Sequence, residues 1–322
     1  MGKTVLVTGI GGVVGQGILR NIRQMEAGVR VIGTNIKRVS AGNYLCDRVY
    51  EIPFAYDPEF KEAVVSAVKN EDVDLIVPST DYESYYLGLY KDSFPCPVAT
   101  SAHEMTAMCL DKWETFKAFA KYNIPFASSC LPSLYQNNFT KTVVKPREGR
   151  GSRNINVDPP VPSSFDDGYV VQEYLDGPEI TTTFYTTRNK EIHGLITFVR
   201  ELESGNTAKC EVVDAYDGEM KRLIDQISSY YQFAGSCNIQ ARVTENGIIP
   251  FEINCRISGT NSVRSQFGFK DVAWTVEEYL FGKKPSPYRG TKGSALRVMV
   301  DLIYPGKTLG SIENKDDDFY IN

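Results

Sequence analysis

The feature that most constrains the fold is a short apolar strand, residues 4–8, that runs directly into a glycine-rich turn and then a helix reaching about residue 27. Further strands are predicted at 29–34, 74–78 and 96–99, with a helix at 58–70. Continuous apolar strands that alternate with helices are typical of a parallel sheet covered on both faces. We therefore predict a doubly wound α/β domain over residues 1–105.

The pattern changes after a linker helix that begins near Asp111, where Asp111 and Glu114 have capping spacing, and ends before Pro125. Short strands separated by turns follow at 141–146, 154–157, 169–175, 178–187, 191–201 and 207–214. A helix at 217–233 interrupts the strands, and a hairpin at 236–254 ends the series. Successive strands joined by turns predict antiparallel sheets, so this second region is expected to be α+β.

Composition limits the chemistry and the partners of the chain. Only two histidines are present, His103 and His193, which excludes a zinc site built on several imidazoles. Seven scattered cysteines without a Cys-x-x-Cys pair predict reduced thiols and a cytoplasmic protein, and the N-terminus lacks the apolar core of a signal peptide. A net charge of −5 gives no general attraction for nucleic acids or anionic membranes, and no apolar stretch is long enough to span a bilayer.

The glycine-rich turn has two interpretations. Glycines spaced as in residues 9–15, after a strand and before a helix, match the fingerprint of a dinucleotide site and would indicate an NAD(P)-dependent oxidoreductase similar to short-chain dehydrogenases. The next strand, however, ends in 34–38 without an acidic residue for a ribose, although Lys37 and Arg38 would suit a 2′-phosphate. The single Tyr-x-x-x-Lys pattern, at Tyr279, comes late in the chain. Close packing of strand and helix is favoured, with the dehydrogenase as the alternative.

Two strand ends carry groups suited to a nucleotide. The first ends at Lys145, and the turn 149–152 can offer backbone N–H groups to phosphates; a basic surface hairpin is an equally open interpretation. The second runs from Val170 to a Gly-Pro turn, which leaves the backbone near Glu173 free to pair with a heterocycle. A solvated strand edge explains this second segment as well.

The hairpin 236–254 places polar groups on one face. Glu252, Asn254 and Arg256 alternate with apolar residues. A three-residue loop, residues 245–247 with a left-handed glycine, puts Gln240 opposite Glu252, whereas a two-residue Asn-Gly loop turns Gln240 to the other face. Oxygen ligands two residues apart on a strand can converge on one hard cation, so the pattern predicts a Mg²⁺ site and the longer loop.

Taken together, these segments resemble the ATP-grasp superfamily, and the chain is similar to one half of the carbamoyl-phosphate synthetase large chain and to single-unit carboxylate–amine ligases. The resemblance implies an N-terminal Rossmann-like pre-ATP-grasp domain at 1–105. It implies a linker helix and mobile lid subdomain at 106–175, and an ATP-grasp core with a Mg-ATP site at 176–322. Only one half is present, and no amidotransferase segment accompanies it, so carbamoyl phosphate synthesis by this chain is not expected.

The resemblance also implies roles for individual residues. The implied nucleotide contacts are Lys112, Lys145, Gly149, Gly151, Ser152, Glu173, Tyr174, Leu175 and Glu179. The implied metal ligands are Gln240, Glu252 and Asn254. Arg256 and Lys145 are the implied catalytic cations. Arg200 and Lys209 lie on strands expected to flank the site and are candidates for contacts to the γ-phosphate or the acid, although exposed strand charges are an equally open interpretation. Arg264 is a further candidate for a substrate contact.

The implied reaction uses ATP and Mg²⁺. A small-molecule carboxylate would attack the γ-phosphorus to give an acyl phosphate and ADP, and an amine or similar nucleophile would then displace phosphate. Lys145, where the synthetase has arginine, favours the amino-acid and peptide ligase relatives. An ATP-binding subunit that needs a partner for chemistry is a further alternative, and a homodimer is the assembly that the resemblance suggests.

Overall fold

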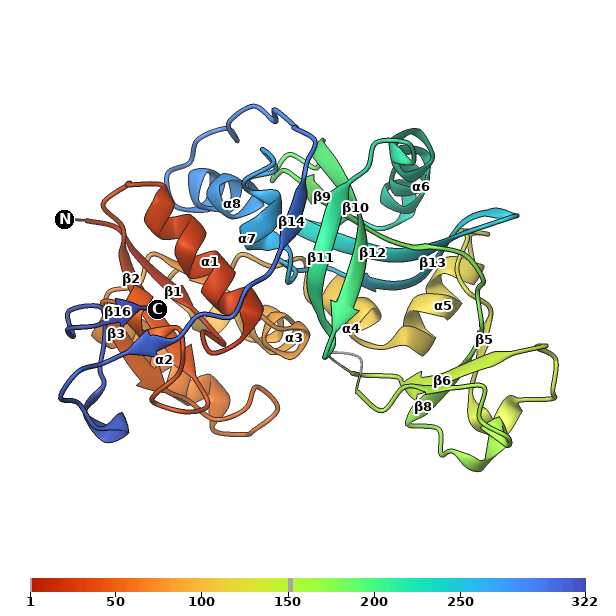
Figure 1. Ribbon diagram of the computed structural model, residues 1–322, viewed down its shortest axis with the longest axis horizontal. Helices are drawn as coiled ribbons and strands as arrows, with labels where there is room; N and C mark the ends of the chain where they lie inside the picture. Colours follow the sequence, from red (N-terminus) through yellow and green to blue (C-terminus); the bar gives the residue numbers. More distant parts are fainter. Residues whose placement is uncertain (1, 150–152) are drawn as a thin grey trace.

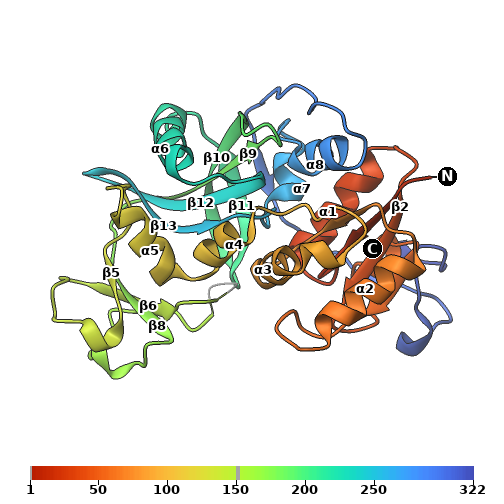
Figure 2. The ribbon, with the colours of Figure 1, turned by 180° about the vertical axis from the view of Figure 1, so that it is seen from behind.

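The computed structural model of the protein describes residues 2–149 and 153–322. Figure 1 shows an N-terminal α/β domain at one end, a large antiparallel sheet in the middle, and a small lid sheet at the other end. Figure 2, from behind, shows α4 (His103–Leu110) and α5 (Lys112–Ala120) beneath the large sheet. The predicted α/β and α+β classes are confirmed.

The N-terminal domain contains a four-stranded parallel sheet in the order β3-β2-β1-β4. Its strands are β1 (Thr4–Val7), β2 (Arg30–Asn35), β3 (Arg48–Glu51) and β4 (Leu75–Val77). Its helices are α1 (Val13–Gln24), α2 (Phe60–Asn70) and α3 (Asp81–Leu89). The sequence did not predict β3, because this edge strand is only half-buried and carries polar residues. The strand predicted at 96–99 is reduced to one bridge, between Ile76 and Val98.

Two glycines at the start of helix α1, Gly15 and Gly17, allow close packing. A Cβ atom on Gly15 would lie 2.4 Å from the carbonyl oxygen of Gly9, and one on Gly17 would lie 2.2 Å from Oδ1 of Asn261. Asn261, on the short helix α7 (Asn261–Arg264), donates from Nδ2 to the carbonyl of Val14 at 3.1 Å. Helix α1 and the C-terminal half of the chain therefore pack closely against each other at this point.

The large sheet is antiparallel, with six strands in the order β13-β12-β9-β10-β11-β14. Their bounds are β9 (Glu179–Thr186), β10 (Ile192–Glu203), β11 (Asn206–Val212), β12 (Gly235–Thr244), β13 (Gly247–Asn254) and β14 (Ser294–Leu296). One hydrophobic core joins this sheet to α6 (Asp217–Tyr230) and to the linker helices through Met108 and Phe119. The linker helices therefore pack with the core sheet rather than with the lid.

The lid is a four-stranded antiparallel sheet in the order β5-β8-β6-β7. Its strands are β5 (Ser129–Cys130), β6 (Thr142–Pro146), β7 (Asn156–Val157) and β8 (Tyr169–Glu173). Two short 3₁₀ helices, Pro132–Leu134 and Pro162–Ser164, lie between these strands, and three others elsewhere in the described chain cover Asn43–Leu45, Lys91–Ser93 and Leu309–Ser311.

The C-terminal segment returns to the N-terminal domain. After α8 (Asp271–Tyr279) and β14, the chain crosses to the pair β15 (Leu302–Ile303) and β16 (Tyr320–Ile321) beside β3 (Figure 1). The Lys315 N–H donates to the carbonyl of Cys46 at 2.9 Å. None of the helices in the described ranges is both long and apolar enough to cross a membrane.

Candidate active site

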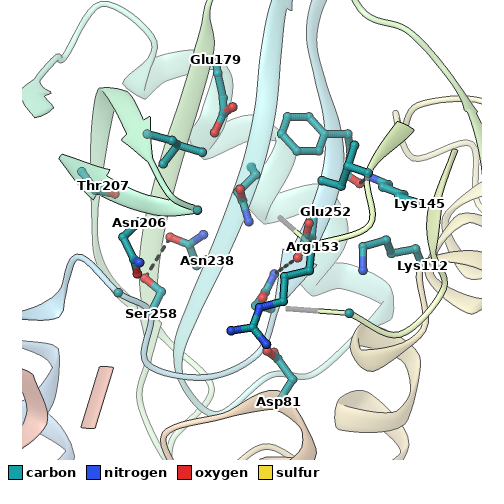
Figure 3. A pocket seen from close by; sticks show the side chains of 18 of the residues that line it. Asp81, Lys112, Lys145, Arg153, Glu179, Asn206, Thr207, Asn238, Glu252 and Ser258 are labelled. Carbon is teal, nitrogen blue, oxygen red and sulfur yellow. Dashed lines mark hydrogen bonds between the residues drawn. The ribbon is translucent and has the colours of Figure 1, made fainter. Parts of the chain in front are cut away.

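A cavity of about 410 Å³ opens where the three units meet. Twelve of the residues predicted from the sequence line it: Lys112, Lys145, Gly149, Glu173, Tyr174, Leu175, Glu179, Arg200, Gln240, Glu252, Asn254 and Arg256. In Figure 3, Glu179 and Asp81 lie at opposite ends of the view, Glu252 lies between them, and Lys112 and Lys145 lie to one side. Gly151 and Ser152 fall outside the described residues.

The hairpin β12–β13 has the predicted pairing for a different reason. Gln240 pairs with Glu252 and Asn238 with Asn254, as expected. The loop, however, has two residues, because Thr244 pairs with Gly247, and the register shifts at Phe251, which has no partner across the ladder. This bulge compensates for the shorter loop and returns Gln240 to the face of Glu252.

The bulge also directs the backbone of Phe251 toward Lys145. The Lys145 ammonium donates to the carbonyl oxygen of Phe251 at 3.2 Å, and it lies 5.1 Å from the centroid of the Phe251 ring. Burial lowers the pKa of Lys145 to about 7; nearby Glu252 raises this pKa and nearby Lys112 lowers it. Lys145 is thus a buried cation poised to gain charge stabilisation from an anionic ligand.

Glu252 belongs to a row of polar groups that crosses from the core to the N-terminal domain. Its Oε1 accepts from Nδ2 of Asn254 at 3.2 Å, and Oδ1 of Asn254 accepts from Nη2 of Arg256 at 2.7 Å. Nη2 of Arg256 also donates to Oδ2 of Asp81 at 2.7 Å. Burial raises the pKa of Glu252, but Lys112, Lys145, Arg256 and Arg200 together bring it below the ordinary value, so Glu252 is an anion at neutral pH.

Asp81 was not predicted from the sequence. It is the first residue of α3, which begins with a capping box between Thr80 and Glu83 just beyond the buried strand β4. A Thr-x-x-Glu pattern after an apolar strand marks a strand-to-helix turn at the carboxyl edge of a parallel sheet, where ligands bind. That pattern is the sequence signal for Asp81.

The hinge between lid and core has groups suited to a flat heterocycle. Glu173 accepts at Oε1 from the Ser128 N–H at 2.6 Å, and its own N–H donates to the Ser128 carbonyl at 2.9 Å. The Tyr174 N–H donates to the carbonyl of Lys141, whose ammonium lies 3.7 Å from the centroid of the Tyr174 ring. The Leu175 N–H makes no such bond within the described part of the chain, so it remains available to a ligand in the cavity.

Arg200 connects two of the predicted ligand groups. Its Nη2 donates to Oε1 of Glu179 at 2.7 Å and also to Oε1 of Gln240. The side chain is only 12% exposed, so its ion pair with Glu179 is largely screened from water. Arg200 therefore holds the predicted ribose ligand and a predicted metal ligand in fixed positions.

Two of the predicted substrate contacts lie outside the cavity. Thr207 pairs with Leu202 whereas Lys209 pairs with Glu201, so Ala208 is an extra residue that turns Thr207 inward and Lys209 outward. The exposed Lys209 ammonium pairs with Glu201 at 3.1 Å. Arg264 has no exposed side-chain surface and is held by an ion pair with Asp271. The structure therefore does not bring these two residues into the cavity, and sequence spacing shows neither the bulge nor the buried ion pair that keeps them out of it.

The candidate metal ligands suit a hard cation that shares its coordination with a substrate. Glu252 supplies one carboxylate, and Gln240 and Asn254 supply amide oxygens that now accept from Arg200 and Arg256. In the described ranges no three His, Cys, Asp or Glu side chains cluster as a metal site of their own. Mg²⁺ is typically held by one or two carboxylates together with substrate phosphates and water, so the donor set fits Mg²⁺.

Two protein-family models match separate parts of the chain. Residues 165–299 match the model described as "ATP-grasp in the biosynthetic pathway with Ter operon", and residues 5–98 match the "PylC-like, N-terminal domain". The chain contains an ATP-grasp region. The sequence-based recognition of this superfamily is confirmed, and the N-terminal match covers the sheet domain that carries Asp81.

Solved structures of the ATP-grasp fold are similar over most of the chain. N5-carboxyaminoimidazole synthetase from Staphylococcus aureus, complexed with ADP, is 14% identical with a TM-score of 0.74 over 89% of this chain and 79% of that chain. Biotin carboxylase from Campylobacter jejuni is 15% identical, with a TM-score of 0.67 over 85% and 70%. L-amino acid ligase from Bacillus licheniformis is 12% identical, with a TM-score of 0.67 over 89% and 77%. A search among curated proteins found no match.

Proposed function

We propose that this ATP-grasp protein is an ADP-forming carboxylate–amine ligase that uses Mg-ATP. The observation that carries the proposal is the charge of the cavity. Among the described lining residues, seven are lysine or arginine and four are aspartate or glutamate, although the whole chain has a net charge of −5. A polyanion such as ATP is the ligand that this local excess of cations favours.

The nucleotide has a defined orientation in this proposal. The adenine would lie at the hinge formed by Glu173, Tyr174 and Leu175, and the ribose would lie near Glu179. The phosphates would then extend toward Lys112 and Lys145, with Gly149 from the lid turn beside them. Lys112 is 7% exposed and Lys145 is 4% exposed, and neither forms an ion pair with a described carboxylate, so phosphate would supply the anionic partner that both side chains lack.

Mg²⁺ would be held by Glu252, Asn254 and Gln240, where it would neutralise part of the charge on the transferred phosphoryl group. The lining residues do the remaining work. Arg256 lies beside Asn254 and can bind the transferred phosphate, while Lys145 carries positive charge at the same place. Both hold the reacting groups in line, which can contribute about 7–11 kcal/mol of effective concentration.

The proposed chemistry has two steps. A carboxylate oxygen attacks the γ-phosphorus, the bond between that phosphorus and the bridging oxygen breaks, and ADP leaves. The amine nitrogen then attacks the carbonyl carbon, the bond from that carbon to the phosphate oxygen breaks, and phosphate leaves while the amine proton passes to solvent. Closure of the lid would keep water from the acyl phosphate.

The test of this proposal is ATP-dependent ADP release with pairs drawn from amino acids, hydroxy acids and ammonium. We expect Mg-ATP to raise the melting temperature, because a ligand at a hundred times its dissociation constant stabilises the folded protein by about 2.7 kcal/mol. We also expect at least one pair of substrates to release ADP. Lys145→Met should abolish that release, whereas the exposed Lys209→Gln should not.

Each alternative predicts a different result. A melting-temperature shift with NADPH and none with Mg-ATP would support the dehydrogenase and contradict the proposal. If the protein binds the nucleotide but none of the pairs releases ADP, that result would support a subunit that needs a partner protein. A homodimer, suggested by the resemblance, is checked separately by light scattering.

A further inference from the structure

One end of the cavity is not used by the proposed nucleotide and metal contacts. This end lies between the N-terminal domain and the core, away from Glu179 in Figure 3, where Asp81 and Ser258 are labelled. Val14 and Gly259 also line it. We call this part of the cavity the acceptor pocket, defined by Val14, Asp81, Ser258, Gly259 and Arg297.

Arg297 supplies a cation without an anionic partner to the acceptor pocket. It follows directly after β14, and its backbone N–H donates to the carbonyl of Ala208 at 2.7 Å. Its Nη2 donates to the carbonyl of Gly259 at 2.9 Å, which fixes the guanidinium at the wall of the pocket. No described carboxylate lies within ion-pair distance of it. A partly buried guanidinium with free donors is suited to bidentate contact with a carboxylate.

Asp81 supplies the opposite charge. Its Oδ2 accepts from Arg256, whereas its Oδ1 takes no hydrogen bond from the described residues. The Asp81 side chain is 16% exposed, so this free oxygen lies in a largely enclosed place. An unsatisfied carboxylate oxygen in such a place favours a cationic donor from a ligand.

We propose that the nucleophile is an amino acid whose ammonium group is bound by Asp81 and whose carboxylate is bound by Arg297. This inference rests on the proposed ligase function and adds the substrate class. The two groups also fix the orientation of the amino acid. Asp81 is joined through Arg256 to Asn254, a proposed metal ligand on β13, so the amine would lie on the side of the proposed metal site. Arg297 is held instead by the carbonyl of Gly259, and it would bind the carboxylate there.

The test measures binding of the twenty standard L-amino acids by titration calorimetry, in the presence of Mg²⁺ and ADP. We expect at least one of them to bind. Its amide, which lacks the carboxylate, and its desamino acid, which lacks the amine, should each bind at least tenfold more weakly.

Two variants assign each end of the ligand. Arg297→Gln should weaken binding of the amino acid at least tenfold and change the affinity for its amide less than twofold, because the amide has no negative charge for Arg297 to bind. Asp81→Asn should weaken binding of the amino acid and of its amide to the same extent, and it should change the affinity for the desamino acid less than twofold. Lys209→Gln is the matched control, since this cation is exposed and lies outside the cavity.

Stabilisation of each variant by Mg-ATP shows that the fold and the nucleotide site are intact. Absence of binding by all twenty amino acids, with Mg-ATP binding preserved, would overturn the inference and leave the proposed function standing. An Arg297→Gln variant that weakens the amide as much as the amino acid would also overturn it. If the wild-type protein did not bind Mg-ATP, that result would instead contradict the proposed function itself.

Discussion

Lys145 makes the stability of the folded protein depend on pH in a specific way. Its pKa is about 7 in the folded protein against an ordinary value of 10.5, and burial is the main cause. The difference of about 3.5 units corresponds to about 5 kcal/mol at 1.36 kcal/mol per unit. Between these two values the unfolded chain binds a proton that the folded protein has released, so the free energy of unfolding rises with pH.

The perturbation that isolates this effect is Lys145→Met, which removes the ionisable group and keeps a long side chain. The wild-type free energy of unfolding, measured against that of the variant by urea denaturation, should increase by about 2 kcal/mol from pH 7 to pH 9. Below about pH 6 the difference should become constant, because the lysine is then charged in both the folded and the unfolded state.

Lys209→Met is the control, because Lys209 is exposed on the outer face of β11 and its charge remains in water. The difference in free energy of unfolding between Lys209→Met and the wild type should not change between pH 7 and pH 9. A flat difference for Lys145→Met as well would show that Lys145 keeps an ordinary pKa. It would refute the claim that the cavity holds a destabilised cation ready for phosphate.

Three further predictions concern separate parts of the molecule. Arg264→Gln should lower the free energy of unfolding by about 3–5 kcal/mol in urea denaturation, because Asp271 would be left as an unpaired buried charge; an effect below about 1 kcal/mol would contradict this. Gly17→Ala should cost about 1–3 kcal/mol through its clash with Asn261, whereas Gly310→Ala, with open space around it, should not. Arg200→Gln should raise the KM for ATP roughly tenfold or more, since it removes a charge-assisted bond to Glu179, and an unchanged KM would exclude Arg200 from the nucleotide site.

The sequence predicted the polar face of the hairpin because alternation along a strand is a local property. The predicted three-residue loop, however, was wrong, because a two-residue loop and a bulge at Phe251 produce the same pairing. The bulge at Phe251 follows Pro250, which has no N–H to donate and lies on the edge strand of the sheet. Proline in an otherwise regular strand is found at edges and bulges, so Pro250 was a signal for the shift that sequence reasoning overlooked.

Other parts of the site depend on contacts between distant segments, and no local pattern reports them. Lys209 faces outward because of an extra residue at Ala208, and Arg264 is buried against Asp271. Arg297 reaches the cavity only because β14 pairs with β11 after a long excursion of the chain. Local periodicity predicts which side chains share a face of one element, but not which elements meet.

The central claim is that a carboxylate becomes an acyl phosphate in the cavity. The most direct measurement uses the carboxylate substrate from the ADP-release screen with ¹⁸O in both oxygens, followed by mass spectrometry of the released phosphate. The account predicts one ¹⁸O atom per phosphate, because the attacking oxygen leaves with phosphorus when the amine displaces it. Phosphate without ¹⁸O, with both labelled oxygens retained in the organic product, would contradict it.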